Sequence, residues 1–134
     1  MSYTASVAMV DRFGELSLIQ LTDRDGTGQI NMTVLERAIV DAGTVIDGKL
    51  ATRYTVPFEA VPALIEQLAS DIAFYRLHTS PPKEIAGRYD NALRLLDSLA
   101  EGAITLGMEQ PPAALDVQFG NGRDRVFGPG AGGY

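Results

Sequence analysis

The sequence contains no cysteine, which excludes disulfides, zinc–thiolate sites and thiol nucleophiles. A chain without disulfides is expected to fold in a cytoplasm. Long apolar runs are missing too, because no window approaches the roughly 20 consecutive apolar residues of a membrane span. Residues 1–15 also lack a basic region followed by an apolar stretch, which is the pattern of a secretion signal. We therefore expect a protein that is neither secreted nor bound to a membrane.

Basic residues are scarce: 11 Lys and Arg stand against 17 Asp and Glu, which gives a net charge of −6. This balance argues against nucleic acid as a tightly held partner, since such binding relies on cations that neutralise phosphates. DNA could still pass close by without being tightly bound. The 134 residues suffice for one domain with a modest core, and 46% hydrophobic with 21% charged residues is a globular composition.

Histidine occurs once, as His78, and the chain shows no nucleophile motif that this residue could serve. Its position at the end of an expected helix suggests a role at the helix dipole or on the surface. The glycines of 128–133 lack the Lys and the Ser or Thr of a phosphate-binding loop. We expect no catalytic residues, no cofactor and a protein that is not an enzyme.

What the sequence does contain is apolar periodicity at steps of three and four residues, which predicts helices over 32–52, 61–79 and 82–101. The last two should form an antiparallel hairpin, because only a short break separates them. A shorter helical region precedes them, with Thr4 as its cap and an interruption at Gly14. The side chains expected to be mostly buried are Leu35, Ile39, Ile46, Leu68, Ile72, Tyr89, Leu93 and Leu96.

Capping signals flank two of these segments. Either Asn31, or Thr33 with Glu36 three residues later, can cap the first long helix. For the third helix, Ser80 can cap while Pro81 occupies the first helical position. The boundaries of the long helices are therefore marked by side-chain chemistry as well as by periodicity.

These elements predict an all-α fold: a small helical bundle with a long helical hairpin and an extended C-terminal tail rich in Gly and Pro. The helical domain is expected over residues 1–102 and the tail over 103–134. From Gly102 onward lie eight of the 14 glycines, yet apolar side chains are spaced among them. Such a segment either orders against a partner or packs back on its own helices, and the sequence leaves both open.

The segment from Asp23 to Asn31 reproduces the opening of a calcium-binding EF-hand loop, with oxygen-bearing side chains at alternate positions and Gly28 at the turn. The weak candidate ligands are Asp23, Asp25, Thr27, Gln29 and Asn31. The twelfth position, which needs a bidentate Glu, is Val34. We therefore predict a metal-free turn in which the Asp side chains bond to nearby backbone amides, with a weak calcium or magnesium site as the alternative.

Several short motifs over about residues 3–107 are similar to those of a known family. They include Asp11-Arg12-Phe13-Gly14, Leu21-Thr22-Asp23-Arg24-Asp25-Gly26, Ile46-Asp47-Gly48, Val56-Pro57, Tyr75-Arg76-Leu77 and Arg88-Tyr89. In these motifs the chain resembles the small proteins encoded among the head and neck genes of Mu-like prophages, and that family is similar to the head-to-tail adaptors of long-tailed phages. The glycine-rich ending departs from the family's pattern.

The resemblance implies a structural adaptor in the virion neck, assembled in the host cytoplasm as a twelvefold homo-oligomeric ring. It implies the portal protein on one side, a stopper or tail-completion protein on the other, and packaged DNA passing through the lumen without specific binding. An acidic lumen suits such passage, although acidity equally serves solubility. The tail residues expected to contact partners are Phe119, Arg123, Arg125, Val126, Phe127 and Tyr134. The alternatives are a calcium-responsive binding module and a phage-encoded regulator of a host protein.

Overall fold

The computed structural model describes residues 2–107, and within them the chain forms five helices and no strand. The helices are α1 (Ser6–Phe13), α2 (Glu15–Thr22), α3 (Met32–Leu50), α4 (Ala63–Leu77) and α5 (Lys83–Glu101). The predicted all-α class is confirmed, and the three long helices lie where the periodicity placed them. In this part of the chain no helix has both the length and the apolar character needed to cross a membrane.

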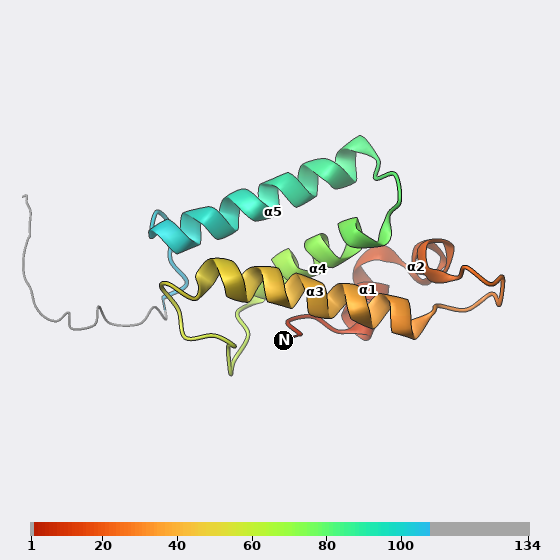
Figure 1. The fold of residues 1–134 in the computed structure, drawn as a ribbon, viewed down its shortest axis with the longest axis horizontal. Helices are drawn as coiled ribbons and strands as arrows, with labels where there is room; N and C mark the ends of the chain where they lie inside the picture. Colours follow the sequence, from red (N-terminus) through yellow and green to blue (C-terminus); the bar gives the residue numbers. More distant parts are fainter. Residues whose placement is uncertain (1, 108–134) are drawn as a thin grey trace, which may run out of the picture.

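The three long helices run side by side in alternating directions, so that the expected α4–α5 hairpin packs on α3 (Figure 1). The two short helices lie beside the N-terminal half of α3, where α1 also touches α4. Gly14 separates α1 from α2 at φ 89°, a positive φ that glycine adopts without steric penalty. The predicted interruption at this residue is confirmed.

Local chemistry explains where α3 and α5 begin. The Asn31 side chain accepts hydrogen bonds from the backbone N–H groups of Thr33 (3.1 Å) and Val34 (3.3 Å), so the first of the two predicted caps is the one used. For α5 the predicted cap was wrong: the N-cap is Pro82, and neither Ser80 nor Pro81 belongs to the helix. The ring of a proline disfavours helical conformation in the residue before it, so the second proline excludes the first from the helix.

The N-terminal cap was also mispredicted, because α1 begins after Ala5 and receives no side-chain cap. Thr4 is instead buried, and its hydroxyl accepts a hydrogen bond from the Ser70 hydroxyl at 2.9 Å. The polar group that could have capped the helix is thus used to tie the N-terminal segment to the middle of α4.

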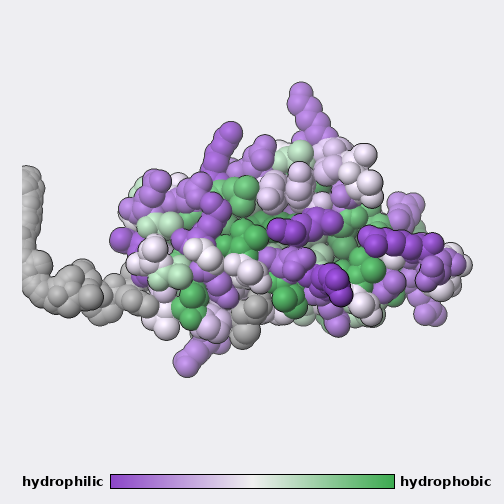
Figure 2. Space-filling view, in the orientation of Figure 1, coloured by the Kyte–Doolittle hydropathy of each residue, from purple (hydrophilic) through white to green (hydrophobic). Residues whose placement is uncertain are grey.

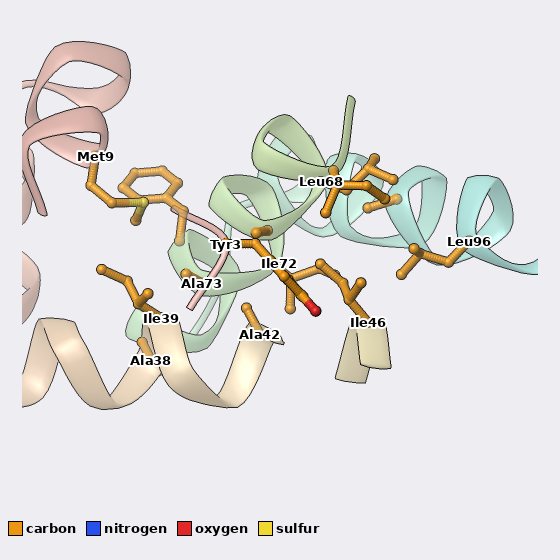
Figure 3. Packing of buried hydrophobic residues seen from close by; sticks show 14 of the residues in the cluster. Tyr3, Met9, Ala38, Ile39, Ala42, Ile46, Leu68, Ile72, Ala73 and Leu96 are labelled. Atoms are coloured by element: carbon orange, nitrogen blue, oxygen red, sulfur yellow. The ribbon is translucent and has the colours of Figure 1, made fainter. Parts of the chain in front are cut away.

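The core lies between α3, α4 and α5 and is extended by Met9 from α1 (Figure 3). Leu35, Ile39, Ile46, Leu68, Ile72 and Leu96 are buried as predicted. Tyr89 and Leu93 are only partly buried, since the buried face of α5 centres on Ala92, Leu96 and Leu99. Tyr89 lies at the rim, where its ring stacks on that of Tyr75 with centroids 3.9 Å apart.

Tyr3 joins the N-terminal segment to the connection between α3 and α4. Its ring is 3% exposed and packs edge-on against Phe58 at 5.6 Å. Its hydroxyl donates a hydrogen bond to Asp47 Oδ1 and accepts one from the Phe58 backbone N–H at 3.1 Å. Burial, followed by the bond to Asp47, raises the pKa of Tyr3 to about 12. One side chain therefore fixes α3 and the following connection to the start of the chain.

Candidate functional site

The calcium-like turn between α2 and α3 is closed by its first acidic side chain. Asp23 Oδ1 accepts hydrogen bonds from the Thr27 N–H (2.9 Å) and hydroxyl (3.0 Å), and Oδ2 accepts one from the Gly28 N–H (2.7 Å). The amides of Thr27 and then Gly28 hold the pKa of Asp23 below its usual value. The prediction that an Asp of this turn bonds to backbone amides is confirmed for Asp23, whereas Asp25 is exposed and contacts no described hydrogen-bond donor.

Two of the other candidate ligands, the side-chain oxygens of Thr27 and Asn31, also have local partners. The Thr27 hydroxyl accepts a bond from the Gln29 N–H at 3.3 Å, and the Asn31 oxygen caps α3. Within residues 2–107, no group of three or more His, Asp and Glu side chains is placed to hold a metal ion. The turn is therefore organised by its own amides.

Sequence reasoning missed the buried hydroxyl that anchors this turn. Thr22 is fully buried; its hydroxyl donates to the Leu18 carbonyl at 2.7 Å and accepts from the Asn31 N–H at 2.9 Å. The end of α2 is thereby bonded to the residue that begins α3. Nothing in the sequence distinguishes a buried Thr from an exposed one at the end of a helix, so this contact had no detectable signal.

Three arginines converge on a pocket that the sequence analysis did not single out. The pocket measures about 390 Å³. Figure 2 shows strongly hydrophilic side chains, interspersed with apolar ones, over the half of the molecule where α3 begins. The walls of the pocket carry Arg24, Arg37 and Arg76, which come from the α2–α3 turn, α3 and the end of α4. Asp41 also lines the pocket, and its Oδ2 lies 4.0 Å from Arg76 Nη1. We call this site the arginine pocket; its remaining lining residues are Thr33, Val34, Ala38 and Leu77.

A second polar pocket lies between α1, α4 and α5 and contains Asp71 with Arg12 and Arg88. Burial raises the pKa of Asp71, and the positive charges of Arg88 and Arg12 oppose that rise. Both arginines have other carboxylate partners: Arg12 of α1 reaches Glu66 of α4 at 3.3 Å, and Arg88 reaches Glu84 on its own helix at 3.8 Å. The positive charge of this second pocket is therefore largely compensated within the chain itself.

His78 caps the C-terminal end of α4, as its position in the sequence predicted. Its Nδ1 lies 2.8 Å from the Phe74 carbonyl oxygen, and its ring packs edge-on against the Phe74 ring at 4.9 Å. The imidazole thus satisfies a carbonyl of the last helical turn, which is a structural role.

Apolar side chains also remain on the surface of the two short helices. Val7 is 70% exposed and Leu16 is 76% exposed, and on α3 Val40 is 45% exposed. These side chains contribute little to the core and are available to a neighbouring molecule. The predicted partner-binding residues of the tail, Phe119, Arg123, Arg125, Val126, Phe127 and Tyr134, lie outside the described residues.

Comparison with known proteins places this chain among proteins of phage Mu and related prophages. Residues 3–120 match the family described as "Bacteriophage Mu, Gp36". The chain is 32% identical to "Gene product J" of Escherichia phage Mu over 116 residues, which covers 85% of this chain and 82% of that protein. It is 27% identical over 119 residues to the "Mu-like prophage FluMu protein gp36" of Haemophilus influenzae, covering 88% and 84% of the two chains.

Proposed function

This chain belongs to the Bacteriophage Mu Gp36 family, and from that membership we propose that it is a structural subunit of the phage neck. In this role it is a head-to-tail adaptor, forming a homo-oligomeric ring between the portal protein and a stopper or tail-completion protein. The proposed ring is dodecameric and belongs to the virion, and the subunit has no enzymatic role.

The observation that carries this proposal, beyond the family, is the apolar surface left open on the short helices. A ring subunit must bury one face against a neighbour and the complementary face against the next copy. Val7 and Leu16 are each more than two-thirds exposed in the single subunit, although they lie on helices that otherwise pack onto the core. Contact with a neighbouring copy would remove these side chains from water.

The tail supplies the proposed contact with the portal. Residues 108–134 carry apolar side chains among Gly and Pro, and a segment of this composition is suited to bind as an extended chain. The proposed anchors are Phe119, Val126, Phe127 and Tyr134, with Arg123 and Arg125 between them. The net charge of −6 supports free passage of DNA through the ring, since an acidic surface does not hold phosphates.

Deletion of the gene from the phage or prophage that carries it tests the proposed function. We expect DNA-filled heads and complete tails to accumulate separately in lysates viewed by electron microscopy, with joining restored when the protein is supplied from a plasmid. Joined, infectious particles in the absence of the protein would show that it is not the adaptor. The same result would favour a regulator of a host protein, because loss of a regulator leaves particle architecture intact.

The alternative of a calcium-responsive module is disfavoured by the turn itself. Both carboxylate oxygens of Asp23 already accept hydrogen bonds from Thr27 and Gly28, so ion binding at this residue would compete with those bonds. The bidentate Glu that such a loop requires is replaced by Val34.

A further inference from the structure

The arginine pocket concentrates positive charge on an acidic protein. Within residues 2–107, Arg24 and Arg37 take part in no ion pair, and Arg76 is paired only with Asp41 at the 4.0 Å limit of a salt bridge. Three guanidinium groups therefore face a pocket that holds a single carboxylate. Guanidinium groups present several N–H donors in a planar fork, and this geometry fits carboxylates in a bidentate manner.

The rest of the pocket selects for the kind of acidic ligand. Ala38 and Leu77 are buried, and with partly buried Val34 they give the pocket an apolar component beside its charged walls. A concave site of this kind fits a peptide that alternates acidic and apolar side chains. Duplex DNA fits it less well, because the pocket is concave, contains Asp41, and lies on a chain of net charge −6.

A segment of the chain itself has this chemistry. Residues 108–118 contain Glu109 and Asp116 but no Lys or Arg, and Leu115 and Val117 flank the second acidic residue. We propose that the arginine pocket of one subunit binds the 108–118 segment of a second copy of this chain, which leaves Phe119 and the residues after it for the portal. The inference rests on the proposed ring and deepens it, because it names the receptor for part of the tail.

The positions of pocket and segment favour pairing between copies. Residues 102–107 follow α5 at the end of the bundle where Gly102 lies against the Arg53 side chain. The arginine pocket lies toward the opposite end, on the first half of α3 and the last turn of α4 (Figure 1). Arg37 and Leu50, the last residue of α3, are 13 residues apart, which corresponds to about 20 Å along the helix. A segment leaving one end and a receptor at the other give the head-to-tail polarity that a closed ring requires.

Disulfide crosslinking tests the proposal directly, because the natural chain has no cysteine. Full-length Thr33→Cys, with its new thiol in the pocket, is mixed with full-length Val117→Cys and oxidised at high protein concentration. We expect a crosslinked heterodimer on a non-reducing gel. Thr44→Cys is the matched control, since Thr44 is exposed and lies 11 residues, about 16 Å, further along α3. It should crosslink about tenfold more slowly. Equal rates at the two positions, or no heterodimer with Thr33→Cys, would overturn the proposal.

Charge reversal tests the role of the arginines. In the Thr33→Cys background, Arg24→Glu with Arg37→Glu should slow crosslinking about tenfold, because charge-assisted hydrogen bonds are replaced by repulsion. Lys83→Glu with Arg94→Glu makes the same change in net charge on α5 and should have little effect. All four side chains are exposed, so these substitutions should leave the melting curve unchanged. The neutral pair Arg24→Gln and Arg37→Gln serves as a second test of the pocket arginines. Identical rates for the pocket and control pairs would refute the assignment.

Two further measurements separate the competing occupants. A chain carrying both Thr33→Cys and Val117→Cys should form crosslinked dimers and larger species; if it forms only an internal crosslink, the pocket holds its own tail and the proposal is wrong. A short DNA duplex should leave the crosslinking rate unchanged, and competition by DNA would assign the pocket to nucleic acid instead. The crosslinking assay needs no phage particles, so a negative result there does not affect the deletion test of the neck function. A negative deletion test likewise does not affect the crosslinking result.

Discussion

The Tyr3 hydroxyl offers the sharpest test of how the fold is held together. Substitution of Tyr3 by Phe keeps the ring and its contact with Phe58 but removes the bond to Asp47 and the acceptor for the Phe58 N–H. A buried donor left without its partner costs about 1–3 kcal/mol, so we expect the free energy of unfolding at pH 7 to fall by about 2 kcal/mol. Tyr75→Phe is the control, because the Tyr75 hydroxyl has no hydrogen bond among the described residues, and it should change stability by no more than about 0.5 kcal/mol.

The raised pKa of Tyr3 gives the same interaction a pH signature. The folded state holds the phenol neutral up to about pH 12, whereas the unfolded chain releases its proton near pH 10. The contribution of Tyr3 is therefore fully present below about pH 10 and is lost as the pH rises from about 10 to 12.

Urea unfolding of wild type and Tyr3→Phe at a series of pH values between 7 and 11.5 measures both effects. Other tyrosines and lysines titrate in this range, so the informative quantity is the difference in unfolding free energy between the two proteins. That difference should be constant up to about pH 10 and shrink above it. A variant as stable as wild type at pH 7, or a difference that does not shrink at high pH, would refute the reasoning.

Four other outcomes follow from the structure. Leu68→Ala, at a side chain 1% exposed, should lower the unfolding free energy by about 2–5 kcal/mol in urea titrations, whereas Leu16→Ala on the surface should change it by no more than about 0.5 kcal/mol. Asp23→Asn should speed hydrogen exchange at the amides of the α2–α3 turn, because it weakens their acceptor. In the wild type the protection of these amides should weaken only as the pH falls below the ordinary range of an Asp pKa, since the pKa of Asp23 is lowered. Millimolar calcium should leave the melting temperature unchanged. Gly102→Ala should destabilise by about 1 kcal/mol or more, because φ is 82° and the added Cβ would lie 2.8 Å from the Arg53 side chain. Truncation after Gly107 should leave the melting curve unchanged while abolishing attachment to portal-bearing heads; an unfolded product, or normal joining, would contradict the proposed role of the tail.

Most of the fold could be read from the sequence because helical periodicity is a local signal. The apolar spacing of Leu35, Ile39 and Ile46 fixes one face of a helix whatever its neighbours are. The Asn31 cap and the Asp23 turn were predictable for the same reason, since donor and acceptor lie within five residues of each other. The error at Pro81 came from ignoring the effect of one proline on the residue before it.

The contacts that could not be predicted join residues far apart in the chain. The Tyr3 hydroxyl forms hydrogen bonds with Asp47 and with the Phe58 N–H, and no local sequence pattern predicts contacts over such separations. Arg24, Arg37 and Arg76 are likewise unremarkable when read in order. They converge only because the end of α4 packs beside the beginning of α3, so the arginine pocket is a product of tertiary packing.

The attachment of the N-terminal segment to α4 bears on how the chain is made. Thr4 bonds to Ser70, so α1 cannot reach its final neighbours until more than half of the chain has been synthesised. At about 5–20 residues per second, ribosomes need several seconds to cover that interval. During that time Met9 and the other apolar side chains of α1 lack the part of their native surroundings that α4 supplies. The nascent polypeptide is therefore most exposed to chaperones and to aggregation at its own beginning, and slowing translation between codons 10 and 70 should lower the soluble yield of the protein.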